Sequence, residues 1–148
     1  MKKLLAILLL VPALVFAQKQ PKGVTYDAQI LRITDGDTVV IAAPFLPKPL
    51  KPELAVRVYG VDTPEKGFRA QCDSEKQRGE AASAFTKNAI AAAAASGGKI
   101  QATLYGWDKF GGRVLGDILV NGQSLRAALI ANGFAREYYG KAKQSWCQ

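Results

Sequence analysis

The sequence has 148 residues, a length that suits a single domain with one hydrophobic core. Its 20 Lys and Arg residues exceed its 12 Asp and Glu residues, and the formal net charge of +8 favours a polyanionic partner. The sequence contains no histidine, which excludes Ser-His-Asp and Cys-His mechanisms. Any acid–base chemistry must therefore use carboxylates, Lys, Tyr, water or a metal ion.

The first 17 residues have the composition of a secretory signal peptide. Two lysines are followed by an apolar run from Leu4 to Phe16 and then by the small residue Ala17. This run is shorter than the ~20 residues of a membrane-spanning helix, and an uncleaved N-terminal anchor is the alternative. We expect cleavage after Ala17, which lowers the formal net charge from +8 to +6 by removing two lysines. We therefore expect an exported protein, periplasmic or secreted, without stable membrane association.

After a polar leader at residues 18–23, the first half of the chain has the pattern of β-strands. Strands are predicted over Val24–Ile33, Thr38–Ala42 and Leu54–Tyr59, where β-branched, aromatic or alternating apolar residues are frequent. Asp35-Gly36 is a hairpin turn signal. Four prolines between positions 44 and 52 predict an irregular connection, because proline cannot donate a hydrogen bond to a strand ladder.

The second half of the chain contains the predicted helices. Residues 66–77 are predicted to form a polar loop, and an alanine-rich helix follows from about Gly79 to Ala95. Two more strands (Ile100–Trp107 and Val114–Val120), a short helix (about Ser124–Ala131) and a tail complete the chain. These elements predict a mainly β, α+β domain over residues 24–148, a five-stranded OB-type barrel with two to three helices.

Asp37 and Asp62 are candidate ligands for a metal ion, because each lies at the end of a predicted strand. Asp37 belongs to Asp-Gly-Asp-Thr, and Asp62 belongs to Val-Asp-Thr-Pro-Glu. Carboxylate oxygens suit a hard divalent cation, which supplies part of what phosphodiester hydrolysis needs. Each aspartate taken alone also has a simpler explanation, since both sequences are ordinary turn formers.

Arg57 and Arg113 are candidate phosphate ligands, because a guanidinium group binds phosphate through two parallel hydrogen bonds. Glu65 could hold or deprotonate the attacking water. Arg57 and Asp62 are separated by an odd number of positions, so they face one site only if the chain bends near Gly60. The alternatives are that Arg57 pairs with an acid on a solvated face and that residues 108–112 form only a hairpin loop.

In their order along the chain, these clusters resemble the thermonuclease (staphylococcal nuclease-like) family. The similarity runs from about Tyr26 to Tyr139. It comprises Asp-Gly-Asp-Thr at 35–38, Arg57, Val-Asp-Thr-Pro-Glu at 61–65, Gly-Glu-Ala at 79–81, Ala-Phe-Thr-Lys at 84–87, Asp-Lys-Phe-Gly-Gly-Arg at 108–113 and Asn-Gly-Phe-Ala at 132–135. One departure is a second glycine before Arg113, and another is the proline-rich stretch, which reads as an insertion.

The resemblance implies a calcium-dependent endonuclease that hydrolyses DNA and RNA with little sequence preference. It implies that Ca²⁺, or alternatively Mg²⁺ or Mn²⁺, is held by Asp37, Asp62 and the backbone carbonyl of Thr63. Arg57 and Arg113 would bind the scissile phosphate, with Glu65 as general base or water-positioning group. Further candidates for substrate binding are Lys109, Phe110, Tyr138 and Tyr139. We expect a monomer, and the alternative function is a non-catalytic OB-fold module that binds nucleic acid.

The two cysteines, Cys72 and Cys147, predict a disulfide, because an even count is typical of exported chains. Two thiols without histidine make a poor zinc site. The chain ends at Gln148, about where the family's last long helix would begin, so we expect a truncated C-terminal helix. A short tail frays unless something fixes it. We therefore predict that the disulfide holds the tail to the loop after Glu65, with two unpaired thiols as the alternative.

Overall fold

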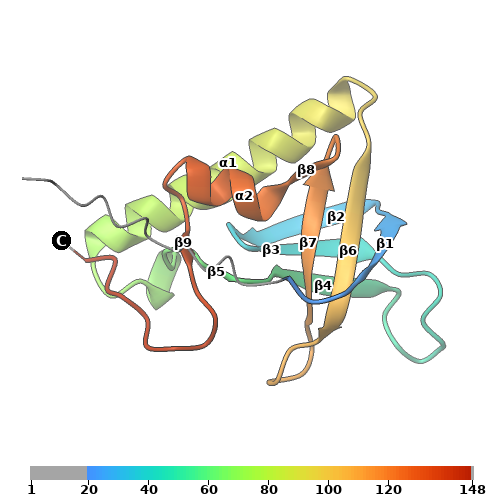
Figure 1. Ribbon diagram of the computed structural model, residues 1–148, viewed down its shortest axis with the longest axis horizontal. Coiled ribbons are helices and arrows are strands. Elements are labelled where there is room, and N and C mark those ends of the chain that lie inside the picture. The colour runs from blue at the N-terminus through green and yellow to red at the C-terminus, as the bar shows by residue number, and fades with distance from the viewer. Residues whose placement is uncertain (1–19, 148) are drawn as a thin grey trace, which may run out of the picture.

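The fold is α+β, with two helices packed against a mixed β-sheet (Figure 1). The computed structural model describes residues 20–147, so the predicted signal peptide at 1–17 lies outside the described residues. Within residues 20–147, no helix is long and apolar enough to cross a membrane. The largest fully buried aliphatic side chains join sheet and helices in one core, and they include Val39, Val56, Val58, Ile118, Leu125 and Leu129.

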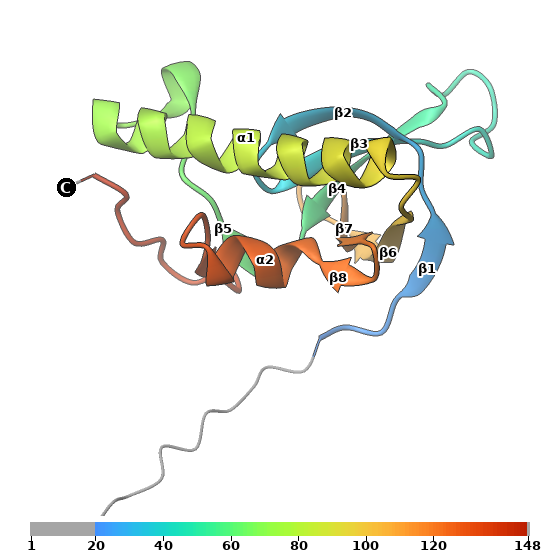
Figure 2. The same cartoon turned by 90° about the horizontal axis from the view of Figure 1, so that it is seen from above.

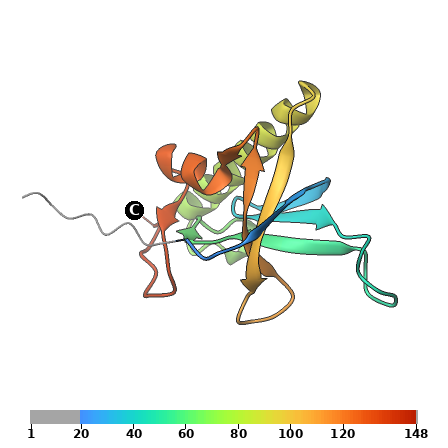
Figure 3. The same cartoon turned by 45° about the vertical axis from the view of Figure 1, so that its right-hand side comes forward.

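The main sheet has the strand order β1-β6-β7-β4-β3-β2. Its strands are β1 (Val24–Asp27), β2 (Ile30–Asp35), β3 (Thr38–Ala42), β4 (Glu53–Val58), β6 (Ile100–Trp107) and β7 (Val114–Val120), and β8 (Gln123–Ser124) pairs with β7. Neighbouring strands are antiparallel except β4 and β7, which are parallel. Figures 1 and 3 show the β6–β7 hairpin crossing β2, β3 and β4 steeply.

The single strand predicted over Val24–Ile33 is two strands with different partners. β1 pairs with β6, whereas β2 pairs with β3. Between them, the Ala28 amide donates to the Ile100 carbonyl at 3.0 Å, and the Gln29 carbonyl accepts from the Ala42 amide at 2.9 Å. The two edges of the sheet are thus consecutive parts of the chain, joined by a bend that the sequence pattern does not reveal.

Helix α1 (Asp73–Ala95) begins before the predicted start at Gly79, so the prediction of a loop over residues 66–77 was wrong. Cys72 is the N-cap, and its sulfur accepts a hydrogen bond from the Glu75 amide. Asp73 and Glu75 place negative charge at the positive end of the helix dipole. Polar residues that stabilise a helix start were therefore mistaken for a loop. The rest of that stretch contains the 3-10 turn η1 (Gly67–Arg69).

Helix α2 (Leu125–Ala131) lies close to its predicted bounds, and Ser124 caps it by accepting from the Ala127 amide at 3.1 Å. Figure 2 shows α1 and α2 side by side over the sheet. Between them the rings of Phe85 and Phe134 have their centroids 4.8 Å apart. The two helices thus form one layer.

The tail after α2 contains a short strand instead of a further helix within the described residues. This strand, β9 (Arg136–Glu137), pairs with β5 (Val61–Asp62) in a second, two-stranded sheet. The predicted Cys72–Cys147 disulfide is confirmed, with the two Cα atoms 6.0 Å apart. It joins the tail to the start of α1, not to a loop as expected.

Candidate active site

Asp37 is buried in the turn between β2 and β3, with 2% of its surface exposed. The turn packs closely on α1, because a Cβ at Gly36 would lie 2.8 Å from the Ala82 Cβ and the Thr86 hydroxyl donates to the Gly36 carbonyl at 2.7 Å. Burial raises the pKa of the Asp37 carboxyl, and the charge of Arg57 and a hydrogen bond from Thr38 oppose that rise. A further cation beside this carboxylate would favour its charged form.

Arg57 forms a two-point ion pair with Asp37. The register of β3 and β4 sets Arg57 opposite Thr38, the residue after Asp37. Its Nη1 lies 3.3 Å from Oδ1 and its Nη2 lies 3.1 Å from Oδ2. Because the guanidinium has five N–H donors, it can hold this orientation and still donate to a phosphate.

The chain bends at Gly60, where Arg57 and Asp62 would need a bend in order to face one site. Gly60 lies between β4 and β5 with a φ of 78°, a conformation that favours glycine. The bend brings Asp62 and Thr63 into the interior, where they are 4% and 6% exposed.

Arg113 is held by Asp108, an aspartate that is 8% exposed. Arg113 Nη2 donates to Asp108 Oδ2 at 2.8 Å, and the Asp108 amide donates to the Arg113 carbonyl at 2.9 Å. Gly111 and Gly112 both have positive φ, 71° and 72°. Two consecutive glycines therefore form a turn whose backbone conformation residues with a side chain would rarely adopt. With this turn, Arg113 lies beside Asp108.

One pocket of about 650 Å³ brings together Arg57, Glu65 and Arg113, the three predicted catalytic residues. The predicted substrate-binding residues line the same pocket, namely Lys109, Phe110, Tyr138 and Tyr139. Asp62 and Thr63 line a neighbouring pocket that shares Glu65 and Lys143 with it. Cationic and aromatic side chains in one groove suit phosphates and stacked bases respectively.

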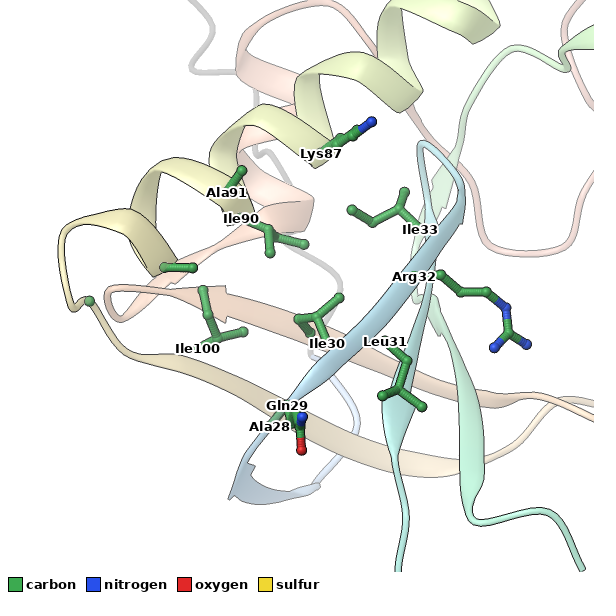
Figure 4. Close-up of a pocket in the computed structure, with 12 residues that line it drawn as sticks. Ala28, Gln29, Ile30, Leu31, Arg32, Ile33, Lys87, Ile90, Ala91 and Ile100 are labelled. Carbon is green, nitrogen blue, oxygen red and sulfur yellow. The ribbon is translucent and has the colours of Figure 1, made fainter.

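A second large cavity, of about 670 Å³, lies between β2 and α1 (Figure 4). In this view the side chains of Ile30, Ile33 and Ile90 face one another between the strand and the helix. Among the residues that the structure describes, Arg32 and Lys87 are the charged ones that line it, and none of the others is acidic. The cavity therefore lacks the carboxylate that metal-assisted hydrolysis requires.

The staphylococcal nuclease homologue family model matches residues 55–146. The chain belongs to the staphylococcal nuclease family. The matched segment contains every predicted catalytic, metal-binding and substrate-binding residue except Asp37, which is tied to the site by its ion pair with Arg57. No curated protein sequence matches the chain. Membership of the staphylococcal nuclease family indicates a nuclease-like function acting on nucleic acid.

Sequence reasoning missed the residues that hold the site residues in place. Asp108 could have been found, because it shares one turn with Arg113. Arg126 donates to the Tyr139 hydroxyl at 2.6 Å, and no local sequence signal predicts this contact. The same is true of Lys143 and Trp146, which contact the two carboxylate oxygens of Asp62.

Helix α1 supports the backbone of Glu65. The Glu65 amide donates to Glu75 Oε1 at 3.2 Å. Gly79 allows the close approach of this segment, because a Cβ there would lie 2.3 Å from the Glu65 carbonyl oxygen. The position of Glu65 in this staphylococcal nuclease homologue therefore depends on a glycine one turn along the helix from Glu75.

We expect Gly79→Ala to lower the free energy of unfolding by about 1–3 kcal/mol, the usual cost of overpacking. It should also lower the cleavage rate, because the segment carrying Glu65 must shift. Urea denaturation and initial rates measure the two effects. Gln77→Ala, at an exposed position of the same helix, is the control. If Gly79→Ala had the same free energy of unfolding and the same cleavage rate as the wild type, the packing of α1 would not determine the position of Glu65.

Proposed function

We propose that the chain is an exported, calcium-dependent nuclease that hydrolyses phosphodiester bonds of DNA and RNA with little sequence preference. The observation that carries this proposal is the pocket of about 650 Å³ in which Arg57, Glu65 and Arg113 meet. Two guanidinium groups can compensate the charge that grows on the phosphoryl oxygens, and a carboxylate can accept the proton of the attacking water.

The groups beside this pocket fit a hard divalent cation. Asp37 and Asp62 offer buried carboxylates, and Thr63 offers a backbone carbonyl. Asp62 Oδ1 already faces a cationic group, the Lys143 ammonium at 2.6 Å. Such an oxygen donor set suits Ca²⁺, with Mg²⁺ or Mn²⁺ as alternatives, better than zinc. When bound, the cation would supply positive charge for the phosphoryl oxygens.

The arginines are oriented before substrate arrives. Asp37 holds Arg57 and Asp108 holds Arg113, so little reorganisation is needed when the transition state forms. The Glu65 side chain is 39% exposed, which leaves it accessible to the water that it would deprotonate or position. Bases would stack on the aromatic residues of the pocket, which recognise any base and so give little sequence preference.

We expect Arg57→Ala and Arg113→Ala each to lower kcat by ~10²–10³-fold, the usual effect of removing one preorganised donor. Single-turnover rates at saturating substrate measure this loss. Arg32→Ala is the matched control, because Arg32 also forms a two-point ion pair, with Glu53, outside the pocket. If Arg113→Ala cleaved at the wild-type rate, the assignment of Arg113 as a phosphate ligand would be contradicted, and Lys109 would be the next candidate for that role.

The proposed export of the chain is supported by the N-terminal sequence and by the disulfide, since disulfides persist in oxidising compartments. We propose one monomeric domain over residues 24–148, in which β1 and β2 act as a single bent strand that closes a five-stranded OB-type barrel. The support for closure is that the residues joining the two sheet edges bond to β6 on one side and to β3 on the other.

Incubation with single- and double-stranded DNA and RNA in calcium tests the nuclease against the binding-module alternative. A nuclease degrades all four substrates to short fragments. A non-catalytic module retards them on a gel in a salt-dependent way and leaves them intact. Intact, retarded substrates would overturn the proposed function in favour of the module.

A further inference from the structure

Both carboxylate oxygens of Asp62 are contacted by side chains from the C-terminal tail. The Trp146 indole Nε1–H donates to Oδ2 at 2.9 Å, and the Lys143 ammonium lies 2.6 Å from Oδ1. Asp62 and Trp146 are 4% and 7% exposed, so the indole bond forms away from solvent. Because an indole nitrogen can only donate, the Asp62 carboxylate is the acceptor of this hydrogen bond.

Several independent contacts fix Trp146 in this position. Arg136 lies opposite Asp62 in the β5–β9 pair, and its guanidinium carbon is 3.7 Å from the centroid of the Trp146 ring. Arg136 Nη1 also donates to the Ser145 carbonyl at 3.0 Å. The next residue, Cys147, is bonded to Cys72 at the start of α1. In Figures 1 and 2 the tail accordingly passes beside β5 and the N-terminal end of α1.

We propose that Trp146 is a positioning residue for the metal ligand Asp62, an inference that rests on the proposed function. The indole holds Oδ2, which restricts rotation of the carboxylate, so that Oδ1, which now pairs with Lys143, is the oxygen that would bind the cation. Partners hydrogen-bonded to a metal ligand typically change metal affinity ~10–100-fold when removed. Lys143 has the opposite effect, because its ammonium competes with the divalent cation for Oδ1.

The test compares the calcium dissociation constants of the purified wild type, Trp146→Phe and Lys143→Gln by isothermal titration calorimetry. Phenylalanine keeps a ring for Arg136 to cover and removes only the N–H donor and part of the ring area. We expect Trp146→Phe to bind calcium ~10–100-fold more weakly, and Lys143→Gln to bind it as tightly as the wild type or more tightly. Intact mass and urea denaturation establish that each variant is folded with its disulfide formed.

A fluorescence measurement tests the same contact without relying on the Trp146→Phe variant. In a Trp107→Phe background Trp146 is the single remaining tryptophan, since the sequence has two. Its emission should change along the calcium titration with the dissociation constant that calorimetry gives, because the cation binds the carboxylate that accepts from the indole.

The outcomes separate this inference from the proposed function. Unchanged calcium affinity in folded Trp146→Phe, or equal weakening in both tail variants, overturns the positioning role alone. If Trp146 contributed only packing, the Trp146→Phe substitution would change the free energy of unfolding and would leave the calcium affinity of the folded protein unaltered. If the wild-type protein bound no divalent cation, the proposed metal site would be wrong, and the positioning role of Trp146 would be wrong with it.

Discussion

Asp37→Asn should lower the cleavage rate by more than ~10³-fold. Asp37 is both a proposed metal ligand and the residue that holds Arg57, so the substitution weakens two parts of the site together. Losing a single preorganised partner costs ~10²–10³-fold, and the combined loss should exceed that figure. Initial rates at saturating calcium measure the effect. Asp27→Asn, at an exposed carboxylate that pairs with Lys99, is the matched control.

The stability of Asp37→Asn should distinguish loss of chemistry from loss of the fold. Burial raises the pKa of Asp37 in the folded state above its unfolded value. When the pKa of a group is higher in the folded than in the unfolded state, its contribution to the free energy of unfolding is fully present below the pKa of the unfolded state. That contribution is lost as the pH rises through the pKa of the folded state. Asparagine removes the cost of burying the charge but also breaks the ion pair with Arg57, so urea denaturation at neutral pH must show that the variant is folded before its rate is interpreted. Wild-type cleavage by this variant would contradict the role of Asp37.

Removing the disulfide with Cys72→Ser and Cys147→Ser together should lower the free energy of unfolding by up to about 4 kcal/mol. The bond joins residues 75 positions apart, and closing a loop of this length removes much of the entropy of the unfolded chain. Serine is the suitable replacement at position 72, because it keeps a side-chain acceptor at the start of α1. Guanidinium denaturation of the two proteins measures the difference.

Reductant provides the control for this variant. It should destabilise the wild type by a similar amount and leave the double variant unaffected. The variant should also bind calcium more weakly, because the tail that carries Trp146 is no longer joined to α1. A loss of stability below about 1 kcal/mol would show that β9 and the contacts of Arg136 fix the tail without the disulfide.

Sequence reasoning succeeded where the signal is local. β3, β6 and β7 have their predicted bounds, because each is rich in apolar and β-branched residues and is limited by turn residues. Gly60 has the positive φ that a bend between Arg57 and Asp62 would need, and the odd number of positions between these two residues had pointed to it. The start of α1 was missed, because polar residues that cap a helix resemble a loop. The contact of Trp146 with Asp62 was missed, since it joins residues 84 positions apart and leaves no pattern in the sequence.

The dependence of cleavage on a divalent cation tests the central claim most directly. Purified protein is incubated with DNA and with RNA in calcium, in excess chelator, and in chelator followed by excess calcium. The account predicts fragments in calcium, intact substrate in chelator and fragments again when calcium is restored. Undiminished cleavage in excess chelator would contradict it, because Arg57, Glu65 and Arg113 would then act without a metal ion at Asp37 and Asp62.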